Sequence, residues 1–333
     1  MPRTARQRKK VFVTRAIEAA ALERLRTAAA VTVWPDDKPA PAWALRSALS
    51  DADAILSMLT DRIDERLIAR AQRLRVISNL AVGVDNIDVD AATRAGIAVG
   101  HTPGVVTDAT ADLAFGLLMA TARRIAEADR YVRAGKWRTW GPTTMLGRDV
   151  HAGTLGIIGF GAIGQAMARR ARGFEMRVLY LRHGSSGRKH RVPEGAVGVS
   201  LPRLLAQSDY VSLHVPLTAK TRHMIGAREF ARMKPGAILI NTARGPVVNQ
   251  AAMVAALKSG HLGGAGLDVT DPEPISSGDR LVRFDNVVIT PHIGTASIAT
   301  RANMAAIAVD NILDVFAGRV PRRCANTPVK LRP

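Results

Sequence analysis

The sequence of 333 residues contains one cysteine, Cys324, few aromatic residues and no long apolar run. A single cysteine excludes a disulfide scaffold, a cysteine-rich zinc module and an iron–sulfur cluster, and we expect no metal site. No uncharged apolar stretch reaches the ~18 residues of a transmembrane helix, so no membrane span is expected. The apolar part of the basic N-terminus is only VFV at 11–13. Because this is too short for a secretion signal, the compartment we expect is the reducing cytoplasm.

Acidic residues are also scarce, with 28 Asp and Glu against 47 Lys and Arg, for a formal net charge of +19. Such an excess is typical of proteins that bind nucleic acids. However, the basic residues are spread along much of the chain, and only 4% of residues are aromatic, which leaves few platforms for stacking bases. We therefore consider nucleic acid an unlikely partner, while an anionic small ligand stays compatible with the charge.

The remaining composition is that of a globular protein, with 47% apolar and 23% charged residues, and the length predicts about two domains. Short β-type runs alternate with helical patterns in two series, which predicts α/β architecture with two parallel sheets. The first series has runs at 11–15, 31–34, 53–59, 74–80 and 96–100; the second has runs at 154–164, 176–182, 210–216, 237–245, 264–269 and 287–294. A helical pattern over 107–134, beginning at Thr107 or Asp108, separates them, and another covers 297–316. The 107–134 helix could pack between domains or form a subunit interface.

A glycine motif opens the second series. GFGAIG places Gly159, Gly161 and Gly164 in the spacing G-x-G-x-x-G, after the β-type run LGII and before a helical run. The first glycine permits the tight turn, the second lets backbone approach a pyrophosphate, and the third allows close helix–strand packing. The helix N-terminus adds unpaired N–H groups and a partial positive charge. In this context the motif predicts dinucleotide binding rather than a simple turn.

Arg182 ends the strand that follows the glycine motif, where an Asp or Glu usually binds the adenosine ribose of NAD. His183 comes next, and further basic residues follow. A carboxylate would repel a 2′-phosphate, whereas a guanidinium can bind it with two hydrogen bonds. We therefore expect NADPH to be preferred. The alternative is that Arg182 is an exposed surface residue and that NADH is also accepted.

Three short motifs follow later strands of the second series: NTARG with Arg244, GLDVTDPEP with Glu273 and TPHIG with His292. Ligands of open α/β sheets bind beyond the carboxyl ends of the strands, so these side chains can converge there. Each residue also has a simpler explanation: a surface cation, a turn residue before Pro274 and a hydrogen-bonded polar residue after Pro291.

Taken together and in order, these blocks resemble the D-isomer-specific 2-hydroxyacid dehydrogenase family over nearly the whole chain. LAVGVDNIDVDAATRAGIAVGHTPGVVTDATADLAFGLLMATARR is similar to the substrate loop and following helix of that family, and LGIIGFGAIG, HVPLT, MKPGAILINTARGPVVN, GLDV and TPHIG are similar to its cofactor and catalytic blocks. Within the family, the chain is similar to the glyoxylate/hydroxypyruvate reductase group, which also includes 2-ketogluconate reductases.

The resemblance implies roles for individual residues. Arg244 would bind the substrate carboxylate and polarise the keto oxygen, His292 would donate the proton, and Glu273 would orient and stabilise the protonated imidazole. Val82 and Gly83 would offer backbone N–H groups to the substrate, and Trp140 of a partner subunit could reach the pocket, with Trp137 as the competing candidate. The residues that would contact the cofactor are Thr107, Gly159, Gly161, Ala162, Ile163, Gly164, Arg182, His183, Val215, Pro216, Thr242, Ala243, Asp268 and Gly294.

The family resemblance also implies a domain arrangement and an activity. A flavodoxin-like substrate-binding domain would comprise 1–102 and 296–333, with a Rossmann domain over 103–295 inserted in it and a homodimer formed through the 107–134 helix. The expected activity is NADPH-dependent reduction of glyoxylate and hydroxypyruvate to D-2-hydroxy acids. Alternatives are another 2-keto acid such as 2-ketogluconate, or a dinucleotide-sensing corepressor or scaffold of the same family.

Overall fold

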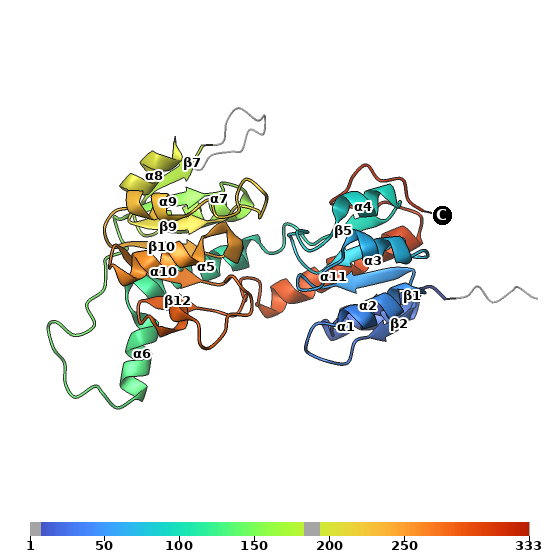
Figure 1. Ribbon diagram of the computed structural model, residues 1–333, viewed down its shortest axis with the longest axis horizontal. Helices are drawn as coiled ribbons and strands as arrows, with labels where there is room; N and C mark the ends of the chain where they lie inside the picture. The colour runs from blue at the N-terminus through green and yellow to red at the C-terminus, as the bar shows by residue number, and fades with distance from the viewer. Residues whose placement is uncertain (1–7, 183–193, 333) are drawn as a thin grey trace, which may run out of the picture. The chain divides into compact units, whose positions relative to one another are not determined.

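The computed structural model describes residues 8–182 and 194–332. The chain divides into two compact units, one formed by residues 1–106 with 296–333 and the other by residues 107–295. The second unit is therefore inserted into the first, and each is described by itself (Figure 1). No helix in the described ranges is both long enough and apolar enough to span a bilayer.

Unit 1 contains a five-stranded sheet in the order β2-β1-β3-β4-β5, with every pairing parallel. Its strands are β1 (Lys10–Val13), β2 (Ala30–Val33), β3 (Ala54–Ser57), β4 (Val76–Asn79) and β5 (Ala98–Gly100), and its helices are α1 (Ala19–Ala28), α2 (Ala42–Leu49), α3 (Glu65–Arg70), α4 (Val89–Arg94) and α11 (Ile298–Phe316). The five β-type runs expected from the sequence correspond to these five strands.

Successive side chains on the strands of unit 1 point to opposite faces of the sheet, so the unit has two separate apolar cores. Val11 and Val13 of β1 face a cluster that includes α1 and α11, whereas Phe12 between them belongs to a cluster with α2, α3 and α4. Because successive strand side chains point to opposite faces, helices cover both sides of the sheet.

Unit 2 contains a seven-stranded parallel sheet in the order β12-β11-β10-β9-β6-β7-β8. Its strands are β6 (Thr154–Ile158), β7 (Arg177–Leu181), β8 (Val197–Val199), β9 (Tyr210–Leu213), β10 (Ala237–Asn241), β11 (Leu262–Leu267) and β12 (Val287–Ile289), and its helices are α5 (Thr107–Ala122), α6 (Ile125–Arg133), α7 (Ala162–Arg172), α8 (Leu201–Gln207), α9 (Ala227–Arg232) and α10 (Gln250–Lys258). Short 3-10 turns occupy Gly245–Val247 and Arg280–Arg283. The sequence did not predict β8, a three-residue edge strand.

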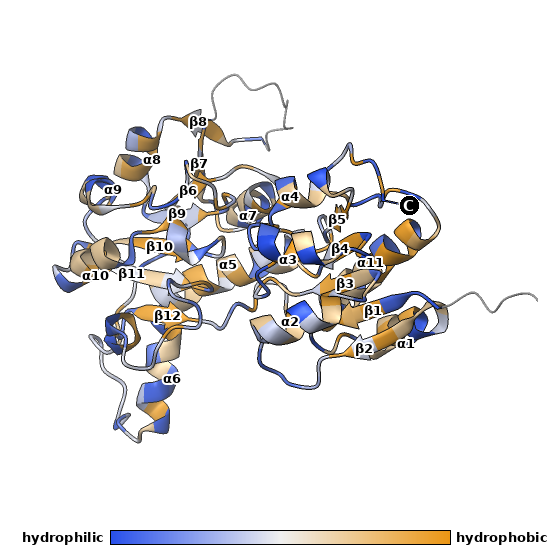
Figure 2. Cartoon of the chain, turned by 45° about the vertical axis from the view of Figure 1, so that its right-hand side comes forward, coloured by the Kyte–Doolittle hydropathy of each residue, from blue (hydrophilic) through white to orange (hydrophobic). Residues whose placement is uncertain are grey.

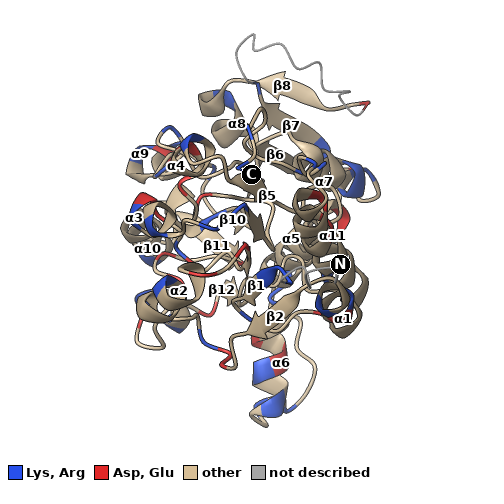
Figure 3. Cartoon of the chain, turned by 90° about the vertical axis from the view of Figure 1, so that its right-hand side faces the viewer, with Lys and Arg blue, Asp and Glu red and all other residues tan. Residues whose placement is uncertain are grey.

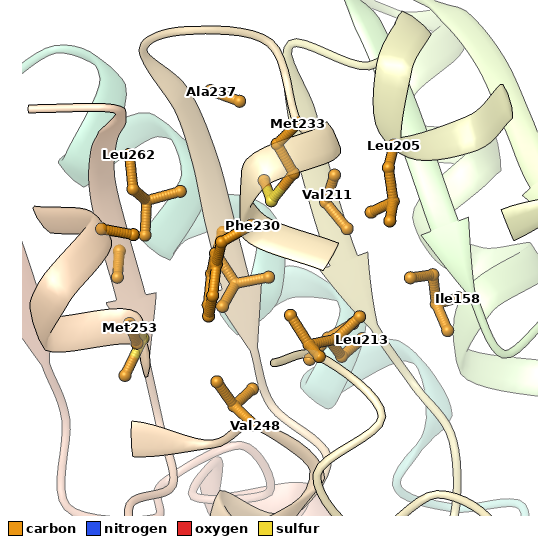
Figure 4. Packing of buried hydrophobic residues seen from close by; sticks show 14 of the residues in the cluster. Ile158, Leu205, Val211, Leu213, Phe230, Met233, Ala237, Val248, Met253 and Leu262 are labelled. Carbon is orange, nitrogen blue, oxygen red and sulfur yellow. The ribbon is translucent and has the colours of Figure 1, made fainter. Parts of the chain in front are cut away.

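The two faces of this sheet have separate apolar cores. One cluster joins α5 and α7 to strand residues such as Ile157 and Ile240. The other packs α8, α9 and α10 against Ile158 and Leu213, with Phe230 near its middle (Figure 4). Both faces of the sheet are thus buried, and polar groups that could contact a ligand lie in the loops at the strand ends.

The single helix expected over 107–134 is wrong: the structure has two helices, α5 and α6, with Arg124 between them in the left-handed region at φ 53°. After α6 the chain comes back to the C-terminal end of α5, where Arg148 N donates to the carbonyl of Ala122 at 2.8 Å. A Cβ at Gly147 would lie 2.5 Å from that same oxygen, so the backbone of this segment packs directly against the end of α5. Arg124 then donates two hydrogen bonds, of 2.7 and 2.6 Å, to the carboxylate of Glu127 and steadies the start of α6.

Candidate active site

Six adjacent parallel strands of unit 2 end at one edge of the sheet. In sheet order they are β12, β11, β10, β9, β6 and β7, and their ends lead into the segments that carry the sequence motifs. Because the strands are parallel, these segments lie at the same edge, where ligands of open α/β sheets bind.

The glycine motif forms the turn from β6 to α7, and each glycine has a distinct environment. Gly159 has φ +99°, and a Cβ there would lie 2.5 Å from the carbonyl carbon of His214. A Cβ at Gly164 would lie 2.2 Å from the Gly159 oxygen. At Gly161, by contrast, a Cβ would meet no protein atom within 4 Å. The open side of the turn is therefore at Gly161.

Gly161 is also the N-cap of α7, and no side chain caps this helix. Ala162 and Ile163 form its first turn, so their N–H groups and the helix dipole are presented beside the open position. The arrangement fits a pyrophosphate, which needs both the space and the donors.

His292 and Glu273 form the central polar pair of this edge. His292 Nδ1 and Glu273 Oε1 are 2.5 Å apart, and the two side chains are 23% and 32% exposed. A carboxylate on Nδ1 fixes the orientation of the ring and leaves Nε2 as the nitrogen that can exchange a proton with a ligand.

A buried carboxylate, that of Asp268, builds the turn on which His292 sits. Asp268 is 2% exposed and accepts hydrogen bonds from Thr290 Oγ1 at 2.6 Å, Ile293 N at 2.8 Å and Gly294 N at 2.7 Å. Its carbonyl accepts from His292 N, and His292 is held at φ 54°. Both Asp268 and Gly294 were expected to contact the cofactor; what the structure shows for them is that they build the turn that holds His292.

Arg244 follows β10 in a turn held by the side chain of Asn241. Asn241 Oδ1 accepts from Ala243 N, and its Nδ2 donates to the Arg244 carbonyl, both at 3.0 Å. Arg244 is half-buried, and its Nη1 donates to the Ala243 carbonyl at 2.8 Å. A Cβ at Gly245 would lie 1.9 Å from the Thr270 oxygen, so this turn packs directly on the segment that leads to Glu273.

Several other residues that were expected to contact the cofactor also lie at or near this edge. Val215 and Ala243 are buried, Pro216 is exposed, and Thr107 begins α5. Within the described residues, the buried Thr242 Oγ1 and His214 Nδ1 have no hydrogen-bond partner. Such orphaned polar atoms beside an uncapped helix fit a polar ligand that reaches the strand ends.

His214 also illustrates what sequence reasoning missed. Burial lowers the pKa of this imidazole to about 4, so it is neutral at physiological pH, and its Nε2 lies 2.9 Å from Ser212 Oγ. Asn241 was missed as well. Both residues lie inside quoted motifs, HVPLT and NTARG, at strand ends, and that position was the available signal.

Arg182 lies directly after β7, as expected. It is exposed, its N donates to the Val199 carbonyl, and its Nη2 donates to the Gly198 carbonyl at 2.6 Å. The strand β8 thus holds both the backbone of Arg182 and one terminal nitrogen of its guanidinium. His183 lies outside the described residues.

The remaining expected site residues do not belong to the segments that follow the unit 2 strands. Val82 and Gly83 belong to unit 1, where their carbonyls bind His101 Nδ1 at 2.9 Å and Asn79 Nδ2 at 3.0 Å. Trp140 follows α6 and is 78% exposed. No group of three or more His, Cys, Asp or Glu in the described ranges is arranged to hold a metal.

Comparisons with known proteins agree with this geometry. Residues 115–294 match the family model described as D-isomer specific 2-hydroxyacid dehydrogenase, NAD binding domain. The chain is 49% identical to the glyoxylate reductase of Korarchaeum cryptofilum over 97% of this chain and 98% of that one.

Two solved structures extend the likeness to three dimensions. The crystal structure of a glyoxylate reductase from Paecilomyes thermophila has a TM-score of 0.85 at 34% identity and covers 96% of this chain and 98% of its own. The NADPH-dependent glyoxylate/hydroxypyruvate reductase of Sinorhizobium meliloti, solved with NADP and malonate, has a TM-score of 0.84 at 31% identity and covers 98% of this chain and 100% of its own. With the glycine turn, the imidazole–carboxylate pair and the arginine turn at one sheet edge, these matches establish that the chain belongs to the D-isomer-specific 2-hydroxyacid dehydrogenase family and is an enzyme that uses a nicotinamide dinucleotide.

Proposed function

We propose that the protein is an NADPH-preferring reductase of small 2-keto acids, with glyoxylate and hydroxypyruvate as substrates. The products are 2-hydroxy acids, of D configuration where they are chiral. The observation that carries the proposal is the 2.5 Å contact between His292 Nδ1 and Glu273 at the sheet edge that also holds the Arg244 turn and the open glycine turn. Relatives named glyoxylate reductase, similar over nearly the full chain, support the substrate class.

In the proposed mechanism, the planar fork of Arg244 binds the substrate carboxylate and draws electron density from the neighbouring keto oxygen. His292, protonated and oriented by Glu273, donates a proton from Nε2 to that oxygen as it becomes an alkoxide. A dinucleotide held at the glycine turn would supply the hydride for the keto carbon. The Glu273 carboxylate stabilises the imidazolium before transfer, and Asp268 keeps the ring in place through the turn around it.

The cofactor preference is proposed from Arg182. The residue replaces the usual ribose-binding carboxylate with a guanidinium; its Nη2 donates to the Gly198 carbonyl of β8, and its other N–H donors would pair with a 2′-phosphate. The related Sinorhizobium meliloti enzyme is described as NADPH-dependent and was solved with NADP, which supports the same assignment here.

Substrate binding is proposed to involve unit 1 through Val82 and Gly83. Their carbonyls are engaged by Asn79 and His101, so the N–H groups are what this loop can offer to a carboxylate. We keep unit 1 as the substrate-binding domain on this basis.

A homodimer is proposed through α6 and the segment that follows it. Ile125 and Val132 of α6 are 52% and 51% exposed, and Trp137, Trp140 and Leu146 beyond it are more exposed still. Figure 2 shows hydrophobic and hydrophilic stretches side by side on this helix. Several exposed apolar side chains close together favour a protein partner, and we propose that this partner is a second copy of the chain and that Trp140 contributes to its substrate pocket. The mass of the enzyme in solution measures this directly.

The decisive experiment is NADPH oxidation by the purified protein with glyoxylate, hydroxypyruvate, pyruvate and 2-ketogluconate in parallel. His292→Gln should lower turnover by about 10²- to 10⁴-fold, the usual contribution of a general acid, while NADPH binding stays within about twofold. His151→Gln is the matched control, because His151 is exposed and precedes β6 at the opposite sheet edge. Tight NADPH binding by the wild type without turnover of any keto acid would instead identify a dinucleotide sensor.

A further inference from the structure

A basic pocket lies in unit 1 between α2 and α3, outside every segment assigned to the reductase reaction. Its volume is about 530 Å³, in the range of sites that hold small molecules. Leu45 and Leu67, both buried, contribute apolar surface. The complete lining is Ala42, Leu45, Arg46, Arg62, Asp64, Arg66, Leu67 and Arg70.

The arginines of this pocket follow a regular spacing. Arg62, Arg66 and Arg70 are four residues apart, so the two on α3 share one helix face, and Arg46 of α2 joins them. Figure 3 shows basic residues on both helices. Like charges at this spacing repel and modestly destabilise a helix, and a bound anion would relieve that repulsion.

The acidic residues nearby are already engaged. The Asp64 carboxylate accepts from Leu67 N at 3.1 Å as the N-cap of α3 and is 3.6 Å from Arg62 Nε. Glu65 pairs with Arg94 on α4 at 2.7 Å. Within the described ranges, Arg46, Arg66 and Arg70 have no ion pair, which leaves the pocket with an excess of positive charge.

We propose that this pocket is a second ligand site that binds a small organic anion with two or more negatively charged groups. Guanidinium forks bind phosphate and carboxylate groups with paired hydrogen bonds, so Arg46, Arg66 and Arg70 would take the charged groups. Leu45 and Leu67 would contact the apolar part of the ligand. The site lies in unit 1, and none of its residues takes part in the proposed reaction. The proposal of a second site can therefore be tested independently of the reductase assignment.

The test is calorimetric titration of the full-length protein, saturated with NADPH so that the dinucleotide site is filled. Pyrophosphate probes phosphate recognition, and tricarballylate probes carboxylate recognition without the hydroxyl of a product. We expect saturable binding of at least one anion, weakened about tenfold or more in Arg66→Gln/Arg70→Gln. The probe that binds with the higher affinity identifies whether the pocket prefers phosphate or carboxylate groups.

The matched control is Arg228→Gln/Arg322→Gln, which removes the same charge from exposed positions outside the pocket. It should retain wild-type affinity. Without ligand, Arg66→Gln/Arg70→Gln should melt no lower than wild type, because a like-charge pair is removed, and its turnover should be unchanged. The proposal is overturned if neither anion binds saturably, if the pocket variant binds as wild type does, or if the control loses affinity equally.

Discussion

Two glycines only three residues apart should respond to the same substitution in opposite ways. At Gly164, a new Cβ would lie 2.2 Å from the Gly159 backbone oxygen, inside a buried helix–strand contact. The β6–α7 turn must shift, and overpacking of this kind costs about 1–3 kcal/mol of unfolding free energy. At Gly161, the new Cβ meets no protein atom within 4 Å, and φ −75° suits any residue. Gly161→Ala should therefore cost no more than about 1 kcal/mol, the scale of an N-cap change.

Cofactor binding should separate the two variants further. In Gly161→Ala the methyl group occupies the position proposed for the pyrophosphate, so NADPH affinity should fall by about tenfold or more, equivalent to at least ~1.4 kcal/mol. Urea unfolding of the protein without cofactor gives the stability of each variant, and quenching of tryptophan fluorescence or calorimetry gives the affinity. If Gly161→Ala bound NADPH as wild type does, or lost as much stability as Gly164→Ala, the assignment of the open position would be refuted.

Two further outcomes are expected. Arg182→Asp should shift the NADPH-to-NADH ratio of kcat/KM toward NADH by about tenfold or more, because a guanidinium–phosphate pair is replaced by repulsion; an unchanged ratio would assign selection to other groups. His214 gives a pH dependence: its pKa is lowered to about 4 in the folded protein, so between pH ~6.5 and ~4 the unfolded chain binds a proton that the folded chain does not. As the pH is lowered from ~6.5 to ~4, the unfolding free energy of the wild type should therefore fall by about 3 kcal/mol more than that of His214→Gln, as measured by chemical unfolding. If the unfolding free energies of the two proteins changed equally with pH, this histidine would not be the cause of the loss.

The sheet architecture could be predicted from the sequence because its signals are local. Short β-type runs, helical periodicity between them and the spacing of Gly159, Gly161 and Gly164 each depend on residues near in sequence. The structure has the corresponding strands, and the environments of the three glycines match the physical reasons for which the motif needs them.

Long-range contacts explain what the sequence could not predict. The sequence has no glycine or proline at Arg124 to mark a helix end; in the structure the backbone turns left-handed there, and Arg148 N donates to the carbonyl of Ala122, the last residue of α5. The engagement of Asp268 by the turn around His292 depends on β11 and β12 being neighbours. The basic pocket likewise arises only when α2 packs beside α3.

The insertion of unit 2 has a consequence for the order in which the protein can be assembled during translation. Helix α11 supplies Met304, Val309 and Ile312 to the core on one face of the unit 1 sheet. The ribosome makes this helix only after all of residues 107–295, so until then α1 alone covers the part of that face on which it packs, and the area against α11 stays exposed. Unit 2, by contrast, is continuous in sequence and buries both of its sheet faces with its own residues. The core of unit 1 thus depends on a helix synthesised almost last, and the apolar area that α11 covers is open to aggregation until that helix has packed.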